Sequence, residues 1–191
     1  MDPVRRIVDG RRASTVQRLL DAALEEIRAV EYGDLSVRSV AKRADVSPAT
    51  AYTYFSSKDH LISSVVWRRV QEVAASFADG ADGAELPTIV RSITDVFAQE
   101  PELSRACTSA LLADDPEVAR LRDEIGAACA QSLSSALPPM PSTAVDSITM
   151  AFVGGLLLAG MGYMPFEAIA DRLNETAEQL RSADGDHTSS Q

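Results

Sequence analysis

Apolar residues in this 191-residue chain recur at intervals of three and four, and this spacing constrains the fold more than any other feature. The first series is Val16, Leu19, Ala23, Ile27 and Val30. Such spacing places side chains on one face of an α-helix. We expect later helices at 58–79, 87–98, 101–112, 115–137, 143–163 and 165–181. Because no strand pattern and no internal repeat accompanies them, the sequence predicts an all-α protein of about nine helices.

The charge of the chain is distributed unevenly. The formal net charge is −10, yet residues 1–79 hold twelve Lys and Arg against eleven Asp and Glu. Residues 80–191 hold six against seventeen, so the deficit lies in the C-terminal part. An acidic body keeps a protein soluble and weakens indiscriminate binding to nucleic acid. The near-neutral head could still meet phosphates with a cluster of arginines. These are Arg5, Arg6, Arg11 and Arg12.

Two short helices joined by a tight turn are predicted between positions 36 and 55. Ser36 suits an N-cap, and an apolar series at helical spacing follows it from Val37 to Ala44. A polar break comes next, in which Ser47 can cap a second helix with Pro48 at its first position. This arrangement is a helix-turn-helix, whose slim second helix can enter the major groove of DNA.

The second of these helices combines small residues, hydroxyls and aromatic rings. We expect Phe55 to pack into the core, while the phenols of Tyr52 and Tyr54 turn toward the DNA backbone; the alternative is that all three rings fill a core. The start of such a helix points into the groove and its end lies against phosphate. Base-facing positions are therefore Ser47, Pro48, Ala49 and Thr53. The full set predicted to contact DNA is Ser36, Val37, Arg38, Ser47, Pro48, Ala49, Thr50, Tyr52, Thr53, Tyr54 and Lys58.

The same residues resemble a known family. The segment "LLDAALEEI" followed by "LSVRSVAKRADVSPATAYTYFSSKDHLI" is similar to the DNA-binding domain of TetR-type transcriptional regulators, over roughly residues 14–65. Three positions depart from that family's pattern: Asp45 replaces the turn glycine, and Ala49 and Ala51 replace a glycine and a leucine of the second helix. Asp tolerates left-handed backbone geometry better than most residues, so the turn is expected to form. The operator sequence does not follow from these residues.

The resemblance implies a homodimer that binds a palindromic DNA operator and represses transcription. It also implies an N-terminal arm and helix-turn-helix domain over 1–57 and a helical ligand-binding and dimerisation domain over 58–181. The polar tail over 182–191 is expected from its own sequence to be disordered. A small molecule in the second domain would shift the helix at 58–79. The two reading heads would then no longer match half-sites one helical turn apart. Whether the ligand releases or strengthens DNA binding stays open.

The last two helices are expected to form the dimer interface, although part of their apolar surface will pack within the chain. They carry small residues that permit close helix approach, and an apolar stripe. These residues are Ala151, Gly154, Gly155, Ala159, Phe166, Ile169, Leu173 and Leu180. A small hydrophobic or amphipathic effector is expected among the middle helices, because the candidate lining residues there are apolar. They are Trp67, Val70, Phe97, Cys107, Leu111, Met150 and Phe152.

Two other classes of protein stay open, a small helical enzyme and a helical interaction module that binds no DNA. The histidines are limited to His60 and His187, and no Ser/His/Asp set or metal-ligand spacing is apparent. No catalytic residue, metal or cofactor is therefore predicted. The segment "GMGYMP" from Gly160 lacks the third glycine of a dinucleotide-binding loop. Asp115 precedes Pro116, which favours a helix N-cap over a pair of catalytic carboxylates.

The sequence predicts a cytoplasmic protein. Its start is charged and lacks the apolar core of a signal peptide. The apolar run from Ile148 to Met164 falls short of a typical membrane span and contains four glycines. We interpret it as a buried helix, with a membrane-spanning helix as the alternative. Cys107 and Cys129 are too few for a disulfide framework and are expected to be buried free thiols.

Overall fold

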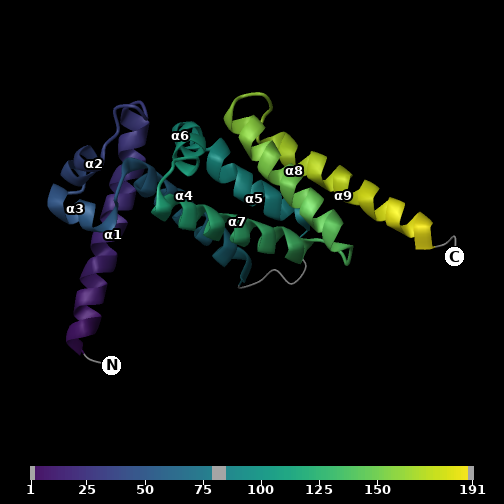
Figure 1. Cartoon of the computed structure of the whole chain (residues 1–191), viewed down its shortest axis with the longest axis horizontal. Coiled ribbons are helices and arrows are strands. Elements are labelled where there is room, and N and C mark those ends of the chain that lie inside the picture. The colour runs from purple at the N-terminus through teal and green to yellow at the C-terminus, as the bar shows by residue number, and fades with distance from the viewer. Residues whose placement is uncertain (1–2, 79–84, 189–191) are drawn as a thin grey trace. The chain divides into compact units, whose positions relative to one another are not determined.

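The protein is all-helical in the part that the structure describes (Figure 1). A computed structural model describes residues 3–78 and 85–188, with side chains over 12–77 and 85–182. These residues form nine helices and no strand, which confirms the predicted fold class. The helices are α1 (Pro3–Ala29), α2 (Val37–Arg43), α3 (Pro48–Tyr54), α4 (Lys58–Ala78), α5 (Leu86–Ala98), α6 (Pro101–Leu111), α7 (Pro116–Ala136), α8 (Ser142–Gly160) and α9 (Glu167–Thr188).

The chain divides into two compact units. The first unit comprises Met1–Arg68 and Arg105–Arg122, and the second comprises Arg69–Ser104 and Asp123–Gln191. The divisions therefore fall inside three helices: α4 after Arg68, α6 after Ser104 and α7 after Arg122. The predicted domain boundary at position 57 remains a prediction.

In the first unit, α1 packs against α2 and α2 packs against α3. The predicted apolar face of α1 is confirmed, since Leu19, Ala23 and Ile27 are buried. Ion pairs tie the neighbouring elements to α1. Arg43 of α2 lies 2.6 Å from the carboxylate of Glu26, and Arg68 of α4 lies 2.6 Å from that of Asp21.

In the second unit, α9 packs against both α5 and α8. Phe97 of α5 stacks on Phe166, just before α9, with ring centroids 6.1 Å apart. Gly155 of α8 lies so close to α9 that an added Cβ would be 3.3 Å from the Ile169 side chain. The absence of a side chain at Gly155 thus allows the two helices to approach each other closely.

Two helices extend further than the sequence pattern indicated. α1 begins at Pro3, so the backbone of the predicted N-terminal arm is helical; Arg12 is exposed, and the other arm arginines lie outside the described side chains. α9 continues to Thr188, past the predicted end near 181, and 189–191 lie outside the described residues. Extending an existing helix costs much less than nucleating one, so a polar sequence can remain helical. Of the predicted boundary at 79–87, positions 79–84 are not described.

Candidate nucleic-acid interface

The turn between α2 and α3 depends on a left-handed residue. Asp45 has φ of 51°. The N–H of Val46 donates to the carbonyl of Ala41 at 2.9 Å, and the N–H of Asp45 donates to that of Lys42 at 3.3 Å. This pair of bonds is a Schellman motif, which satisfies the last carbonyls of a helix. The prediction that Asp45 adopts left-handed geometry is thereby confirmed.

The hydroxyls of α3 organise its own backbone. The Ser47 hydroxyl accepts the N–H of Thr50 at 3.1 Å and lies 2.8 Å from the Thr50 hydroxyl. Pro48 occupies the first helical position, as predicted. The Thr53 hydroxyl donates to the carbonyl of Thr50 at 2.6 Å, and the Thr53 side chain is exposed. A seven-residue helix needs this help, because short helices are marginal on their own.

One side of α3 is buried and the other faces outward. Ala51 is fully buried and Phe55, directly after the helix, is 4% exposed, so the core role predicted for Phe55 is confirmed. Tyr52 is 53% exposed. The remaining outward positions are Ser47, Pro48, Ala49, Thr50 and Thr53. The outward side is uncharged and, apart from Tyr52, made of small residues, a shape that suits a major groove.

The other residues predicted to contact DNA differ in how far their side chains are exposed to solvent. Ser36 caps α2 by accepting the N–H of Ser39 at 3.0 Å, and the Ser39 hydroxyl returns a bond to the Ser36 backbone. Arg38 is exposed and Tyr54 is half-buried. Val37 is 3% exposed, so its side chain belongs to the core and only its backbone could meet a phosphate. The DNA roles of all these residues remain predictions.

Lys58 has partners within the chain. Its ammonium group donates to the carbonyls of Tyr32 at 2.9 Å and Gly33 at 3.3 Å, and it lies 4.5 Å from the centre of the Tyr32 ring. The Tyr32 hydroxyl donates to the carboxylate of Asp59. Burial and this neighbouring carboxylate raise the pKa of Tyr32 well above its usual value. Lys58 thus fastens the α1–α2 turn to the start of α4, a role that the sequence did not indicate.

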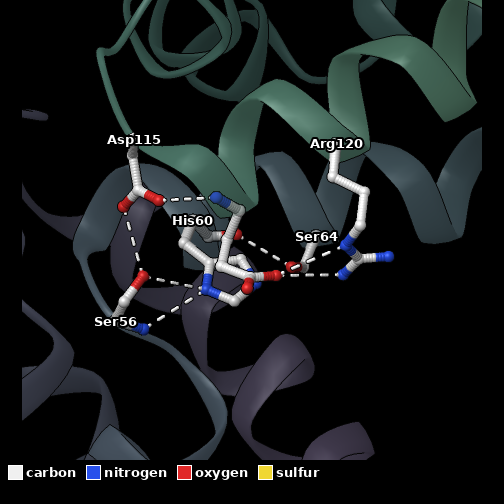
Figure 2. Close-up of polar contacts among 6 residues, drawn as sticks. Ser56, His60, Ser64, Asp115 and Arg120 are labelled. Atoms are coloured by element: carbon white, nitrogen blue, oxygen red, sulfur yellow. Dashed lines mark hydrogen bonds and ion pairs between the residues drawn. The ribbon is translucent and has the colours of Figure 1, made fainter.

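A polar cluster follows the end of α3 (Figure 2). The backbone N–H of Ser56 donates to Nδ1 of His60 at 3.2 Å, and the Ser56 hydroxyl donates to the carboxylate of Asp115 at 3.1 Å. The His60 ring is buried in a T-shaped contact with the Phe55 ring, and burial lowers the pKa of His60. The carboxylate contacts serine rather than histidine, so the order of a catalytic triad is not reproduced. Among the described residues, no group of three His, Cys, Asp or Glu could hold a metal ion.

The predicted effector contacts are distributed over both units. Trp67, Cys107 and Leu111 belong to the first unit and are partly buried. Those of the second unit are Val70, Phe97, Met150 and Phe152. On α8, Phe152 is fully buried whereas Met150 is 71% exposed, because positions two residues apart point to opposite sides of a helix. Met150 instead lines an open surface hollow of about 360 Å³ with Asp146, Thr149 and Val153.

An apolar stripe lies exposed on α8. Met150, Val153 and Leu157 follow one another at spacings of three and four, and all are exposed. Leu158 lies beside them, and Met161 and Tyr163 continue the exposed surface past the helix end. By length and composition α8 could cross a membrane, and 22% of its most apolar window is buried. The sequence prediction of a buried helix therefore holds for only one side of α8.

The segment "GMGYMP" forms the C-terminal end of α8 and the turn that follows it. Gly162 has φ of 81°, and the N–H of Tyr163 donates to the carbonyl of Leu158 at 2.9 Å. The N–H of Gly162 donates to the carbonyl of Ala159 at 2.9 Å. This is a second Schellman motif, so the glycine ends a helix rather than approaching a phosphate.

The helical fold and the outward-facing α3 define a helix-turn-helix DNA-binding protein. Residues 19–65 match the profile of bacterial regulatory proteins of the tetR family. An uncharacterized HTH-type transcriptional regulator of Mycobacterium tuberculosis (strain H37Rv) is 43% identical over 168 residues, which are 85% of this chain and 78% of that protein. The chain belongs to the TetR family of bacterial transcriptional regulators and is a DNA-binding regulator.

Solved structures share the fold. A TetR transcriptional regulator from Rhodococcus sp. RHA1 superposes with a TM-score of 0.73 at 21% identity, covering 89% of this chain and 97% of that one. The TetR-family repressor FadR from Thermus thermophilus, solved in complex with lauroyl-CoA, superposes with a TM-score of 0.60 at 22% identity, covering 86% and 92%.

Proposed function

We propose that this regulator represses transcription as a homodimer that reads a two-fold symmetric operator with the outward side of α3. The observation that carries the proposal is the division of α3 into a buried side at Ala51 and an exposed side at Ala49, Tyr52 and Thr53. One short helix reads too few base pairs for specific control, so two copies are needed. Small side chains at Ala49 and Thr53 would meet base edges, and the Tyr52 and Tyr54 hydroxyls would meet the backbone.

Substitutions on α3 test the reading role. Thr53→Ala removes an exposed hydroxyl whose bond is to the Thr50 carbonyl within α3, and the high helix propensity of alanine should retain the helix. We expect it to weaken binding to a preferred duplex and to leave binding to random DNA unchanged, since base contacts carry the specificity. Fluorescence anisotropy over both duplexes at several salt concentrations measures this. Equal losses on both duplexes would contradict base reading by Thr53.

The exposed stripe on α8 supports dimerisation. Contiguous exposed apolar surface on a soluble protein marks an interaction site, and here Met150, Val153 and Leu157 are aligned on one helix. We propose a second copy of the chain as its partner, because operator symmetry requires two reading heads. The close approach at Gly155 is already used by α9 of the same chain, so the outward stripe, rather than Gly155, would meet the partner.

Sedimentation of charge variants tests the dimer. Val153→Glu places a carboxylate in the proposed interface, and burying an unpaired charge is costly. We expect this variant to sediment as a monomer and to lose operator binding. Gln131→Glu, on the exposed part of α7, is the matched control and should remain a dimer. A wild-type monomer that partitions into lipid vesicles would instead assign the α8 stripe to a membrane.

We further propose that a small apolar or amphipathic molecule controls DNA binding. The apolar candidates Trp67, Val70 and Phe97 support this class of ligand. The FadR repressor solved with lauroyl-CoA shares the fold at 22% identity, so an acyl-CoA is the first class to test and no residue correspondence follows. A ligand that binds the folded state raises the melting temperature by mass action. We expect long-chain acyl-CoA to raise it and free coenzyme A to leave it unchanged; stabilisation by coenzyme A alone would contradict an apolar site.

A further inference from the structure

Residues at the exit of α3 contact a carboxylate that is distant in the sequence. Ser56 and Ser57 connect α3 to α4, and both hydroxyls donate to the same oxygen of Asp115, at 3.1 and 2.7 Å. Figure 2 shows the Asp115 carboxylate directed at Ser56 from the start of α7. The segment that ends the recognition helix is therefore held from a second element, 58 or 59 residues further along the chain.

The Ser57–Asp115 bond joins the N-caps of two helices. Ser57 caps α4, because its hydroxyl oxygen accepts the N–H of His60 at 3.0 Å. Asp115 caps α7, because its other carboxylate oxygen accepts the N–H of Glu117 at 2.9 Å. A carboxylate is favoured at a helix N-terminus, and hydrogen bonds to a charged acceptor are stronger than neutral ones. In agreement, the hydrogen bond from Ser57 holds the pKa of Asp115 below its usual value.

The Ser56 hydroxyl has one proton and two nearby acceptors. It lies 3.2 Å from Nδ1 of His60 and 3.1 Å from the carboxylate of Asp115. Nδ1 already accepts the backbone N–H of Ser56, so the hydroxyl proton is directed to Asp115. The two hydroxyls of the α3–α4 junction are thus directed at the Asp115 carboxylate, while the backbone N–H of Ser56 is bonded to His60.

We propose that Asp115 is a positioning residue for DNA binding, which joins the N-caps of α4 and α7 and thereby fixes the direction in which the chain leaves the C-terminal end of α3. The proposal rests on the reading role of α3 proposed above. α3 is a seven-residue helix whose buried contacts are limited to Ala51 and the following Phe55. Its position therefore depends on the segments at its two ends. Asp115 caps the start of α7, so a displacement of that end of α7 would reach the α3–α4 junction through Asp115.

The test compares two neighbouring aspartates. Asp115→Asn keeps an oxygen to cap α7 but replaces the oxygen that accepts from the two serines with an NH₂ group. Asp114→Asn removes the same charge from an exposed neighbour and is the matched control. Both variants are also placed in a Ser56→Ala, Ser57→Ala background. Binding is measured on a duplex that the wild-type protein has selected from a random pool, at several salt concentrations, together with amide hydrogen exchange.

We expect Asp115→Asn to weaken binding at least threefold with an unchanged salt slope, since no phosphate contact is lost. Asp114→Asn should stay within twofold of wild type, and in the serine-deleted background Asp115→Asn should change affinity by less than twofold. Amides 51–55 should exchange faster in Asp115→Asn. The proposal would be overturned if Asp115→Asn bound DNA as tightly as Asp114→Asn and its faster exchange were confined to the first turn of α7. Asp115 would then act only as the N-cap of α7.

The experiment distinguishes failure of base reading by α3 from failure of the positioning role proposed for Asp115. If the wild-type protein selected no duplex, base reading by α3 would be contradicted. Hydrogen exchange would still decide the role of Asp115: faster exchange at 51–55 supports positioning of α3, and unchanged exchange there overturns it.

Discussion

At the scale of single residues, several polar side chains predicted to contact DNA have hydrogen-bond partners within the chain. For Lys58, the contact predicted from the sequence motif differs from the hydrogen bonds in the structure. Its place in the sequence predicts a phosphate contact, whereas its ammonium group is bonded to the carbonyls of Tyr32 and Gly33. The two roles predict different salt dependence, because a phosphate contact releases counterions and an internal contact does not.

We expect Lys58→Met to lower the free energy of unfolding by about 1–2 kcal/mol, the scale of hydrogen bonds from a charged donor. The salt slope of DNA binding should stay unchanged. Urea unfolding and affinity titrations over a salt series measure these two quantities. Arg38→Met, which alters an exposed arginine of α2, is the comparison. A slope reduced by about one unit in Lys58→Met alone would assign Lys58 to a phosphate.

His60 makes stability depend on pH. Burial lowers its pKa below the ordinary value of 6.5, although the carboxylates of Asp115 and Glu117 raise the pKa and Arg120 lowers it. Below pH 6.5 the unfolded chain therefore binds a proton that the folded chain does not. The stabilisation is present above 6.5 and is lost as pH falls toward the lowered value.

We expect the free energy of unfolding to fall between pH 7.5 and 5.5 in wild type and to fall less in His60→Asn. Asparagine keeps an acceptor near the position of Nδ1 and does not titrate. Urea unfolding at both pH values measures the difference. Equal pH dependence in the two proteins would show that His60 does not contribute.

At the scale of elements, turns and caps follow from local sequence and long-range packing does not. Ser36, Ser47 and Pro48 occupy the cap and first-turn positions that their chemistry favours, so α2 and α3 begin where predicted. The ends of α1 and α9 have no such local signal and were predicted too short. Two Schellman motifs end α2 and α8, one with Asp45 and the other with Gly162 at the left-handed position.

That pair of motifs predicts the effect of substitutions at Asp45. Left-handed geometry costs a non-glycine residue about 1–2 kcal/mol. Glycine avoids this cost, but its greater freedom in the unfolded chain offsets part of the gain. We expect Asp45→Gly to stabilise the protein by up to about 1 kcal/mol and Asp45→Val to destabilise it by more than about 1 kcal/mol. Thermal and urea unfolding measure both. Stabilisation by valine would contradict the left-handed turn.

Gly155 tests the close approach of α8 and α9. An added Cβ would lie 3.3 Å from Ile169, whereas one on Gly126 of α7 would have nothing within 4 Å. Gly126→Ala should stabilise by up to about 1 kcal/mol, the difference in helix propensity. Gly155→Leu should instead destabilise by about 1–3 kcal/mol, the usual cost of overpacking. Urea unfolding at one protein concentration compares the two variants. Equal effects on the free energy of unfolding would contradict the close packing of Gly155 against α9.

At the scale of the whole molecule, the sequence predicts the helix-turn-helix because that motif is local and continuous. It does not predict the contact of Ser57 with Asp115, since 58 residues separate the two and neither pattern indicates the other. Nor does apolar spacing distinguish a helix face buried in the chain from one that is exposed. Phe152 and Met150 belong to the same apolar run, yet only Phe152 is buried.

The most direct measurement is selection of random duplex DNA by the wild-type protein and by Ala49→Asn, with sequencing of the bound pools. We predict that wild type enriches an inverted repeat whose half-site centres are about 10–10.5 base pairs apart or a multiple of that spacing, as two-fold symmetric helix-turn-helix dimers require. Ala49→Asn should change the preferred base at one symmetric position in each half. An unstructured pool, or the same repeat selected by both proteins, would contradict base reading by α3.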